Sequence, residues 1–365
     1  MEKLKRVILL CFSIFMFSST LEASEITTEI IEQARESVVL LQVSTVDNPG
    51  ITTPTATCAG AVVTKEGYIV TNYHCVHDQK SIKLYYFDDN DWGDYSVEVI
   101  GTDPLGDLAL LKVLNRKGKD VPFLKFAPQN DIKLGEEVFA LGHPMGMVFS
   151  LSKGIISSVE RYARHPYIKA LQTDAAINKG NSGGPLMNTK GEIVGIASLL
   201  VSRGGGSQGV GIAIRSDIVR NSVAQMITTG KADRPALGIM IIPLWGKKSQ
   251  LDKISKDFPT ITVTIPNTYG LLMNDEKYVD KTIPKGLRPW DTIIGIDNTF
   301  INNGVEFSDK LINYHIGDRV DVSIIRDKRF LRIKDVLVKV LHIDADKMYG
   351  TGVKIPPLKP EIKKP

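Results

Sequence analysis

The chain has no strong excess of one charge and no internal repeat. Its 365 residues include 45 Lys and Arg and 41 Asp and Glu, which leaves a net charge of only +4. No basic patch with interleaved aromatic residues occurs, so a nucleic-acid partner is not expected. The hydrophobic share of 43% and the charged share of 24% are ordinary for a soluble globular protein. The length suits two or three domains.

Long apolar runs are also missing. The N-terminal run, Val7 to Phe17, is too short for a comfortable transmembrane helix. Three basic residues precede it, and mostly small or polar residues follow it up to Ala23, which is typical of an export signal cleaved there. We therefore expect a signal peptide at residues 1–23 and export to the periplasm or the extracellular space. Left uncleaved, the same segment would anchor the chain to a membrane.

Cysteine is scarce, with three residues in the chain. Cys11 lies in the apolar run and lacks the small preceding residue expected for lipidation. Cleavage leaves Cys58 and Cys75, and an exported protein with two cysteines favours a disulfide. It would close a loop of 17 residues and stabilise the folded state by roughly 3 kcal/mol. Two free buried thiols, or a zinc site with His74 and His77, are the alternatives that the residues alone leave open.

Short strand-like runs broken by Gly, Pro, Asn and Asp begin at residue 38 and predict an antiparallel all-β sandwich or barrel. These runs are Val38–Val43, Ala59–Thr64, Tyr68–Thr71, Ile82–Phe87, Leu108–Val113, Glu137–Leu141, Gly154–Val159, Lys169–Thr173 and Ile193–Leu200. A short amphipathic helix is predicted before them, at residues 26–36. A second helix is predicted at Ser216–Thr229, with Ser216 or Asp217 as N-cap and Gly230 as the stop signal.

A smaller unit follows a linker at residues 231–235. It is predicted to contain strands and one helix, at Ile239–Pro243, Thr292–Asp297, Glu306–Asn313 (the helix), Arg319–Arg326 and Arg332–Val340. The Pro/Lys-rich tail at 346–365 is expected to be mobile.

Three polar residues stand at the ends of strand-like runs, where a scaffold presents side chains to a cleft. Ser182 lies among glycines in the segment from Gly180 to Leu186, His74 follows Thr71-Asn72-Tyr73, and Asp107 precedes Leu108. Glycines allow backbone N–H groups to turn inward beside the serine hydroxyl, as an oxyanion hole requires. Alone, each residue has an ordinary structural explanation. Their coincidence predicts a catalytic site.

The predicted chemistry is acyl transfer. Ser182 would be the nucleophile, His74 the general base and Asp107 the residue that orients the imidazole. The N–H groups of Gly180 and Ser182 would form the oxyanion hole. A nucleophile elbow is rejected because the histidine and the aspartate precede the serine and a strand follows it. The order His, Asp, Ser belongs to the double β-barrel proteases.

These motifs resemble those of the HtrA (Deg) family of serine proteases. The resemblance covers roughly Val38 to Val340 and rests on Thr71-Asn72-Tyr73-His74, Asp107 to Val113, Thr173 to Leu186 and Gly209 to Ile214. It implies a mostly β chain with a chymotrypsin-like double β-barrel domain at residues 24–230. A small PDZ-like α+β domain would follow at residues 236–345.

The chain departs from the family pattern at three places. Cys75 directly after the histidine resembles the wider chymotrypsin-like group, in which a disulfide braces the histidine loop, and so implies a Cys58–Cys75 bridge. Lys179 replaces the proline common before the glycine-rich segment. His143 stands where Asn is common.

The resemblance also implies how substrate binds. Ala176 would form the base of the S1 pocket, with Val210, Gly211 and Ile212 as a wall. No carboxylate lies there, so small aliphatic P1 residues such as Val, Ala or Ile are expected. Ser198, Leu199 and Leu200 would pair with the substrate backbone as an added strand.

In the smaller unit, the resemblance assigns a carboxylate-binding loop to Ala236, Leu237, Gly238 and Ile239. Backbone N–H groups of such a loop capture a C-terminal carboxylate. Gly286 to Asp291 matches a turn of the fold, with Trp290 where glycine is usual.

The function implied is an exported, ATP-independent serine endopeptidase of protein quality control or the stress response, regulated through its PDZ-like domain. Its partners would be unfolded or C-terminally exposed polypeptides and two further copies of the chain in a homotrimer. No metal or cofactor is expected. The alternative is a sensor or chaperone-like binding protein with low protease activity.

Overall fold

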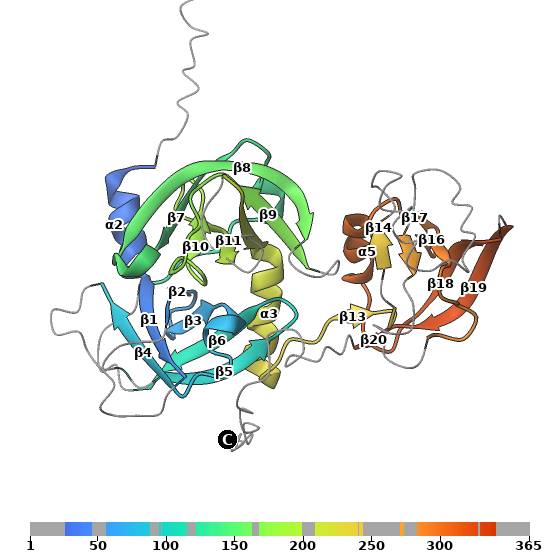
Figure 1. Cartoon of the computed structure of the whole chain (residues 1–365), viewed down its shortest axis with the longest axis horizontal. Helices are drawn as coiled ribbons and strands as arrows, with labels where there is room; N and C mark the ends of the chain where they lie inside the picture. The colour runs from blue at the N-terminus through green and yellow to red at the C-terminus, as the bar shows by residue number, and fades with distance from the viewer. Residues whose placement is uncertain are drawn as a thin grey trace, which may run out of the picture.

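The computed structural model describes residues 26–45, 56–87, 95, 97–114, 122–162, 168–198, 209–239, 241–243, 271–273, 283–327 and 329–340. The predicted signal peptide and the predicted tail lie outside these residues. Strands dominate, as expected (Figure 1). Within the described part of the chain, no helix is long and apolar enough to cross a membrane.

The first layer is a six-stranded antiparallel sheet in the order β4-β1-β2-β3-β6-β5. Its strands are β1 (Val38–Ser44), β2 (Ala56–Val62), β3 (Tyr68–Thr71), β4 (Ser81–Tyr86), β5 (Val97–Asp103) and β6 (Leu108–Val113). A bridge between Leu84 and Tyr95 brings its two edges together. Its own core contains Leu41, Leu84 and Leu111, all fully buried. β5 is a strand that the sequence did not predict.

The second layer is a closed barrel in the order β10-β11-β12-β9-β8-β7 (Figure 1). Its strands are β7 (Glu137–Gly142), β8 (Ser150–Tyr162), β9 (Lys169–Thr173), β10 (Pro185–Met187), β11 (Ile193–Ser198) and β12 (Gly211–Arg215). β8 is much longer than predicted because register shifts let it bend around the barrel between β7 and β9.

Helices cover both layers. α2 (Thr28–Glu36) begins where the Thr27 side chain accepts the N–H of Ile30, and it lies against β1. α3 (Ser216–Thr229) ends as predicted at Gly230, whose φ is 75°. The predicted N-cap at Ser216 or Asp217 is wrong.

The cap position of α3 belongs instead to Arg215, whose side chain makes no capping bond. The Arg215 guanidinium donates to both carboxylate oxygens of Asp217, at 2.6 and 2.7 Å, so this carboxylate does not cap the helix. Burial raises the pKa of Asp217, but these bonds outweigh it, and the net shift is downward.

The smaller unit contains a third sheet in the order β14-β15-β16-β18-β19, with β17 paired to β16, and a separate pair β13-β20. Its elements are β13 (Pro235–Ala236), β14 (Ile241–Pro243), β15 (Leu271–Met273), β16 (Thr292–Ile296), β17 (Thr299–Phe300), α5 (Gly304–Leu311), β18 (Arg319–Arg326), β19 (Arg329–Leu337) and β20 (Lys339–Val340). α5 starts two residues earlier than predicted because Asn303 caps it. The last predicted strand is divided into β19 and β20.

The predicted linker at 231–235 packs along the first sheet. The backbone of Lys231 forms a parallel β-bridge with Thr102 of β5. The guanidinium of Arg234 pairs with the buried carboxylate of Asp103. A second ion pair joins Lys169 of β9 to Asp309 of α5. The smaller unit is therefore attached to both layers of the larger one.

Candidate active site

The structure brings His74 and Asp107 together at the end of the first sheet. The Nδ1 atom of His74 lies 3.0 and 2.9 Å from the two carboxylate oxygens of Asp107. The backbone N–H of His74 donates to the same carboxylate at 3.0 Å. Asp107 is buried while the imidazole is half-buried. The pair therefore has a desolvated carboxylate behind an accessible ring, which fixes the tautomer and orientation of the ring.

Asp107 has a backbone conformation that non-glycine residues rarely adopt, with φ at 53°. Its carbonyl accepts the side-chain amide of Asn72 at 2.9 Å. The preceding Gly106 donates its N–H to Asp103 at 2.8 Å. These bonds stabilise the turn between β5 and β6 that presents the carboxylate to His74.

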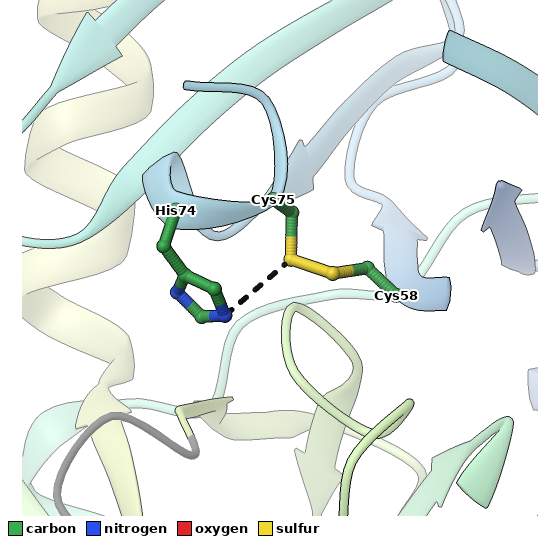
Figure 2. Close-up of side chains that lie close together, drawn as sticks. All are labelled: Cys58, His74 and Cys75. Carbon is green, nitrogen blue, oxygen red and sulfur yellow. Dashed lines mark hydrogen bonds between the residues drawn. A yellow bond between two sulfur atoms is a disulfide. The ribbon is translucent and has the colours of Figure 1, made fainter. Parts of the chain in front are cut away.

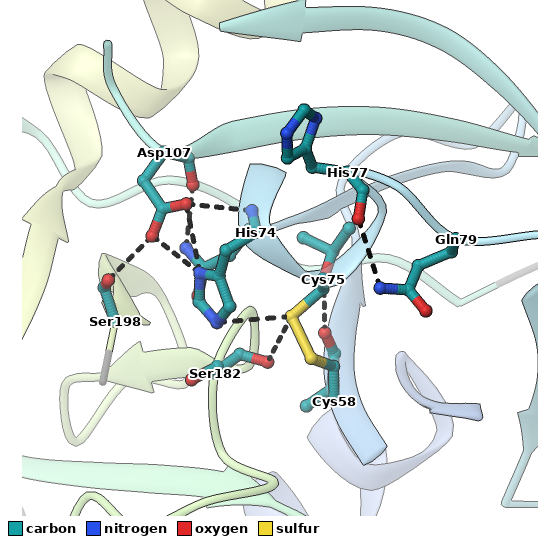
Figure 3. The surroundings of a disulfide bond; sticks show 11 residues. Cys58, His74, Cys75, His77, Gln79, Asp107, Ser182 and Ser198 are labelled. Carbon is teal, nitrogen blue, oxygen red and sulfur yellow. Dashed lines mark hydrogen bonds and ion pairs between the residues drawn. A yellow bond between two sulfur atoms is a disulfide. The ribbon is translucent and has the colours of Figure 1, made fainter. Parts of the chain in front are cut away.

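Ser182 lies beside the imidazole, on the side away from Asp107 (Figure 3). Its carbonyl accepts the N–H of Ala59 at 2.8 Å, and the N–H of Gly183 donates to Ala197 at 2.9 Å. These bonds fix the turn at residues 180–183, here called the serine turn, against both layers. Because Ser182 also precedes a buried strand, β10, a rigid scaffold carries the hydroxyl.

Two positions of the serine turn must be glycine because there is no room for a Cβ atom. Gly180 and Gly183 have φ values of 103° and 85°. A Cβ on Gly180 would lie 2.0 Å from the carbonyl oxygen of His143, and one on Gly183 would lie 2.2 Å from the carbonyl oxygen of Ala59. Neither position tolerates a side chain, which explains the glycine-rich sequence around Ser182.

The predicted Cys58–Cys75 disulfide is confirmed, with an S–S distance of 2.01 Å. The Cys75 sulfur lies 3.6 Å from Nε2 of His74 and 3.9 Å from the Ser182 carbonyl oxygen (Figures 2 and 3). The bridge therefore joins β2 to the short helix Tyr73–Cys75, which carries His74, beside the serine turn. Since both sulfurs are bonded to each other, the free-thiol and zinc alternatives do not apply to this form.

The residues predicted for the S1 pocket lie around one strand end. Gly211 and Ile212 are buried at the start of β12, and Val210 is 52% exposed. A Cβ on Gly211 would lie 3.3 Å from the carbonyl oxygen of Ala175. The Ala176 carbonyl accepts bonds from the side chains of Ser152 and Asn181, at 3.0 and 3.1 Å.

Of the predicted substrate-pairing residues, Leu199 and Leu200 lie outside the described residues. Ser198 ends β11, and its hydroxyl donates to Oδ2 of Asp107 at 2.8 Å. This bond was not predicted, and no pattern in the sequence indicates it. In the smaller unit, Ala236, Leu237 and Ile239 are buried, and Gly238 has φ at 69°.

Sequence reasoning also missed a buried polar cluster behind the candidate active site. The carboxylate of Asp103 accepts the hydroxyl of Ser222 at 2.7 Å and pairs with Arg234, which lies 2.9 Å from the same hydroxyl. All three residues are buried. Because Asp103 also accepts the Gly106 N–H, the cluster connects α3 and the linker to the Asp107 turn.

The chain matches a family model and several curated relatives. Residues 58–196 match the family model described as "Trypsin-like peptidase domain". A "Probable periplasmic serine endoprotease DegP-like" of Chlamydia muridarum is 30% identical over 308 residues, covering 84% of this chain and 59% of the relative. One of Pseudomonas fluorescens is 32% identical over 289 residues, covering 79% and 57%. The chain thus spans less than two thirds of the length of these relatives.

Solved structures give the same result. The structure titled "HtrA-type protease AlgW with tripeptide" superposes with a TM-score of 0.67 at 25% identity, covering 86% of this chain and 97% of that one. The predicted chymotrypsin-like fold is thus confirmed for the two larger layers. The chain is thus similar, in sequence and in fold, to the HtrA family of trypsin-like serine proteases.

Proposed function

We propose that the chain is a serine endopeptidase that hydrolyses peptide bonds with His74, Asp107 and Ser182. One observation carries the proposal. The His74 imidazole is bound through Nδ1 to a buried carboxylate, while Ser182 lies on its other side (Figure 3). Such an arrangement activates a serine hydroxyl in an acyl-transfer enzyme.

In the proposed reaction, Oγ of Ser182 attacks the scissile carbonyl carbon while Nε2 of His74 takes the hydroxyl proton. Asp107 stabilises the imidazolium that forms. The N–H groups of Gly180 and Ser182 donate to the oxyanion. His74 then gives the proton to the leaving amine as the C–N bond breaks, which leaves the acyl group on Ser182. Water next attacks this ester while His74 takes its proton, and His74 returns the proton to Oγ of Ser182 as the acid product leaves.

The proposed substrates are polypeptides cleaved after small aliphatic residues. Ala176, Gly211 and Ile212 offer no charge to a P1 side chain, which supports this preference. The division into a protease domain at 24–230 and a PDZ-like domain at 236–345 belongs to the same proposal. The loop from Ala236 to Ile239 would bind C-terminal carboxylates and so regulate cleavage.

The names of the relatives support export to the periplasm. We place the protein there, either free or tethered by an uncleaved N-terminus, as a homotrimer that acts on unfolded or C-terminally exposed polypeptides in quality control or the stress response. These assignments rest on family analogy.

Casein cleavage by the purified chain, compared with Ser182→Ala and followed by product sequencing, tests the proposal. We expect cleavage after Val, Ala or Ile by wild type, and a loss of roughly 10⁴-fold or more in the variant. Equal activity of the two proteins, or none from wild type with added hydrophobic C-terminal peptides, would contradict it. Suppression of aggregation by an inactive protein would then favour the chaperone-like alternative.

A further inference from the structure

The loop between β7 and β8 touches the serine turn through His143. His143 is fully buried, and its N–H donates to the carbonyl of Gly180 at 3.2 Å. A Cβ on Gly180 would meet the His143 carbonyl oxygen at 2.0 Å, so the two backbones are in direct contact. Any movement of His143 therefore moves one of the two proposed oxyanion-hole residues.

The His143 ring connects the two ends of this loop, residues 143 and 149. Its Nδ1 atom accepts the N–H of Phe149 at 3.0 Å, and the two rings pack edge to face with centroids 4.7 Å apart. Phe149 has φ at 55°, an unfavourable conformation for a bulky residue. The bond from the Phe149 N–H requires an unprotonated Nδ1. Burial supports this state, since it lowers the pKa of His143 to about 4 despite an opposing contact with Val39.

The same loop is held from the first sheet. The Phe149 ring packs edge to face on Phe87, just beyond β4, with centroids 4.8 Å apart. The guanidinium of Arg35 in α2 lies 3.6 Å from the centre of the Phe87 ring. Contacts therefore run from α2 through two aromatic rings to His143 and on to Gly180.

We propose that His143 is a positioning residue for the oxyanion hole, acting through its neutral imidazole on the loop at 143–149 and through its backbone on Gly180. This rests on the proposed function, in which the Gly180 N–H is a donor to the oxyanion. His143 itself touches no substrate. Its loss should therefore weaken transition-state stabilisation and leave substrate binding largely unchanged.

Two substitutions separate positioning from packing. His143→Asn keeps an acceptor, Oδ1, close to where Nδ1 lies, but fills less volume. His143→Leu fills the site with an apolar side chain of similar size and leaves the Phe149 N–H without an acceptor. A packing role predicts that Leu is tolerated better than Asn. A positioning role predicts the opposite order.

The measurements are kcat and KM on a fluorogenic peptide with Val at P1, and inhibition by the matching peptide boronic acid, which mimics the tetrahedral adduct. We expect His143→Leu to lower kcat and weaken boronic acid inhibition by 10- to 100-fold, with KM within about twofold. His143→Asn should stay within about threefold of wild type in all three quantities. A thermal melt of each variant shows that it is folded at the assay temperature.

Each other outcome is decisive. Should the Leu variant unfold, His143→Met replaces it, because its flexible chain adapts to tight sites. If both apolar variants unfold while Asn is active, the bond serves folding and the positioning role is wrong. Leu activity equal to or above that of Asn also overturns it, with the protease proposal intact. An inactive wild type removes both proposals.

Discussion

The proposed catalytic groups are held by two regions that are built in opposite ways. On the first sheet, the His74–Asp107 pair is supported by a disulfide and by the buried ion pair of Asp103 with Arg234. On the barrel side, the serine turn is supported by glycines and by a neutral buried histidine, His143. One region fixes its groups with charge and a covalent bond, and the other with backbone geometry and an uncharged side chain.

The difference follows from what each region does in the proposed reaction. A catalytic carboxylate must stay ionised in a buried site, so its turn needs charged and hydrogen-bonding partners. An oxyanion hole must offer free N–H donors in a fixed position. A carboxylate placed permanently beside these donors would accept their hydrogen bonds in place of the oxyanion.

The largest effect is expected from Arg234→Ala, which leaves the Asp103 carboxylate buried without its cation. Removing one partner of a buried ion pair costs about 3–5 kcal/mol of unfolding free energy. Urea denaturation followed by tryptophan fluorescence measures it. Arg220→Ala, on the exposed face of α3, is the matched control and should change stability by less than about 0.5 kcal/mol. Equal losses in both variants would show that the charge cluster does not support the fold.

The same cluster shows where prediction from sequence ends. Asp103 and Arg234 are 131 residues apart, and only tertiary packing brings them together. The bond from Ser198 to Asp107 likewise spans 91 residues. Neither has a local signal, because no periodicity or spacing encodes which buried polar groups will meet.

Local patterns were predicted much better. β3, β6 and β9 have the bounds expected from their apolar runs, because turn residues mark both ends. His74 and Asp107 were predicted as partners from short motifs, and the structure brings them together. The α3 cap was predicted wrongly because Asp217 is a good capping residue by type, whereas its actual partner is the preceding arginine.

The second prediction tests the barrel side. Gly180→Ala would force a Cβ against the His143 carbonyl and displace the proposed oxyanion donor, so kcat should fall by about 10²–10³. Gly146→Ala is the control, because Gly146 has a similar φ of 80° in the adjacent loop but has nothing within 4 Å of a Cβ. It should retain kcat within about threefold, since only backbone strain is added. Comparable kcat values for the two variants would contradict the argument.

The third prediction concerns the covalent support. Replacing Cys58 and Cys75 by serine should lower the unfolding free energy by about 3 kcal/mol, the chain-entropy value for a loop of this length. Reducing wild type with a phosphine should lower its unfolding free energy by the same amount and move its denaturation midpoint downward. The double variant is the control and should not respond to the phosphine. An unchanged wild-type midpoint after verified reduction would show that the bridge adds no stability.

The smallest effect tests the neutral histidine by pH. Burial lowers the pKa of folded His143 from 6.5 to about 4, so between these values the unfolded chain binds a proton that the folded chain does not. Stability from this residue is therefore complete above about pH 6.5 and is lost as the pH falls toward 4, with about 2 kcal/mol gone between pH 7 and pH 5. His143→Asn cannot titrate, so its stability should fall by about 2 kcal/mol less than that of wild type over this interval. Equal slopes in the two proteins would mean that His143 takes up its proton in the fold as easily as in water. A neutral residue would then not be what holds the barrel side, and the contrast with the charged region would disappear.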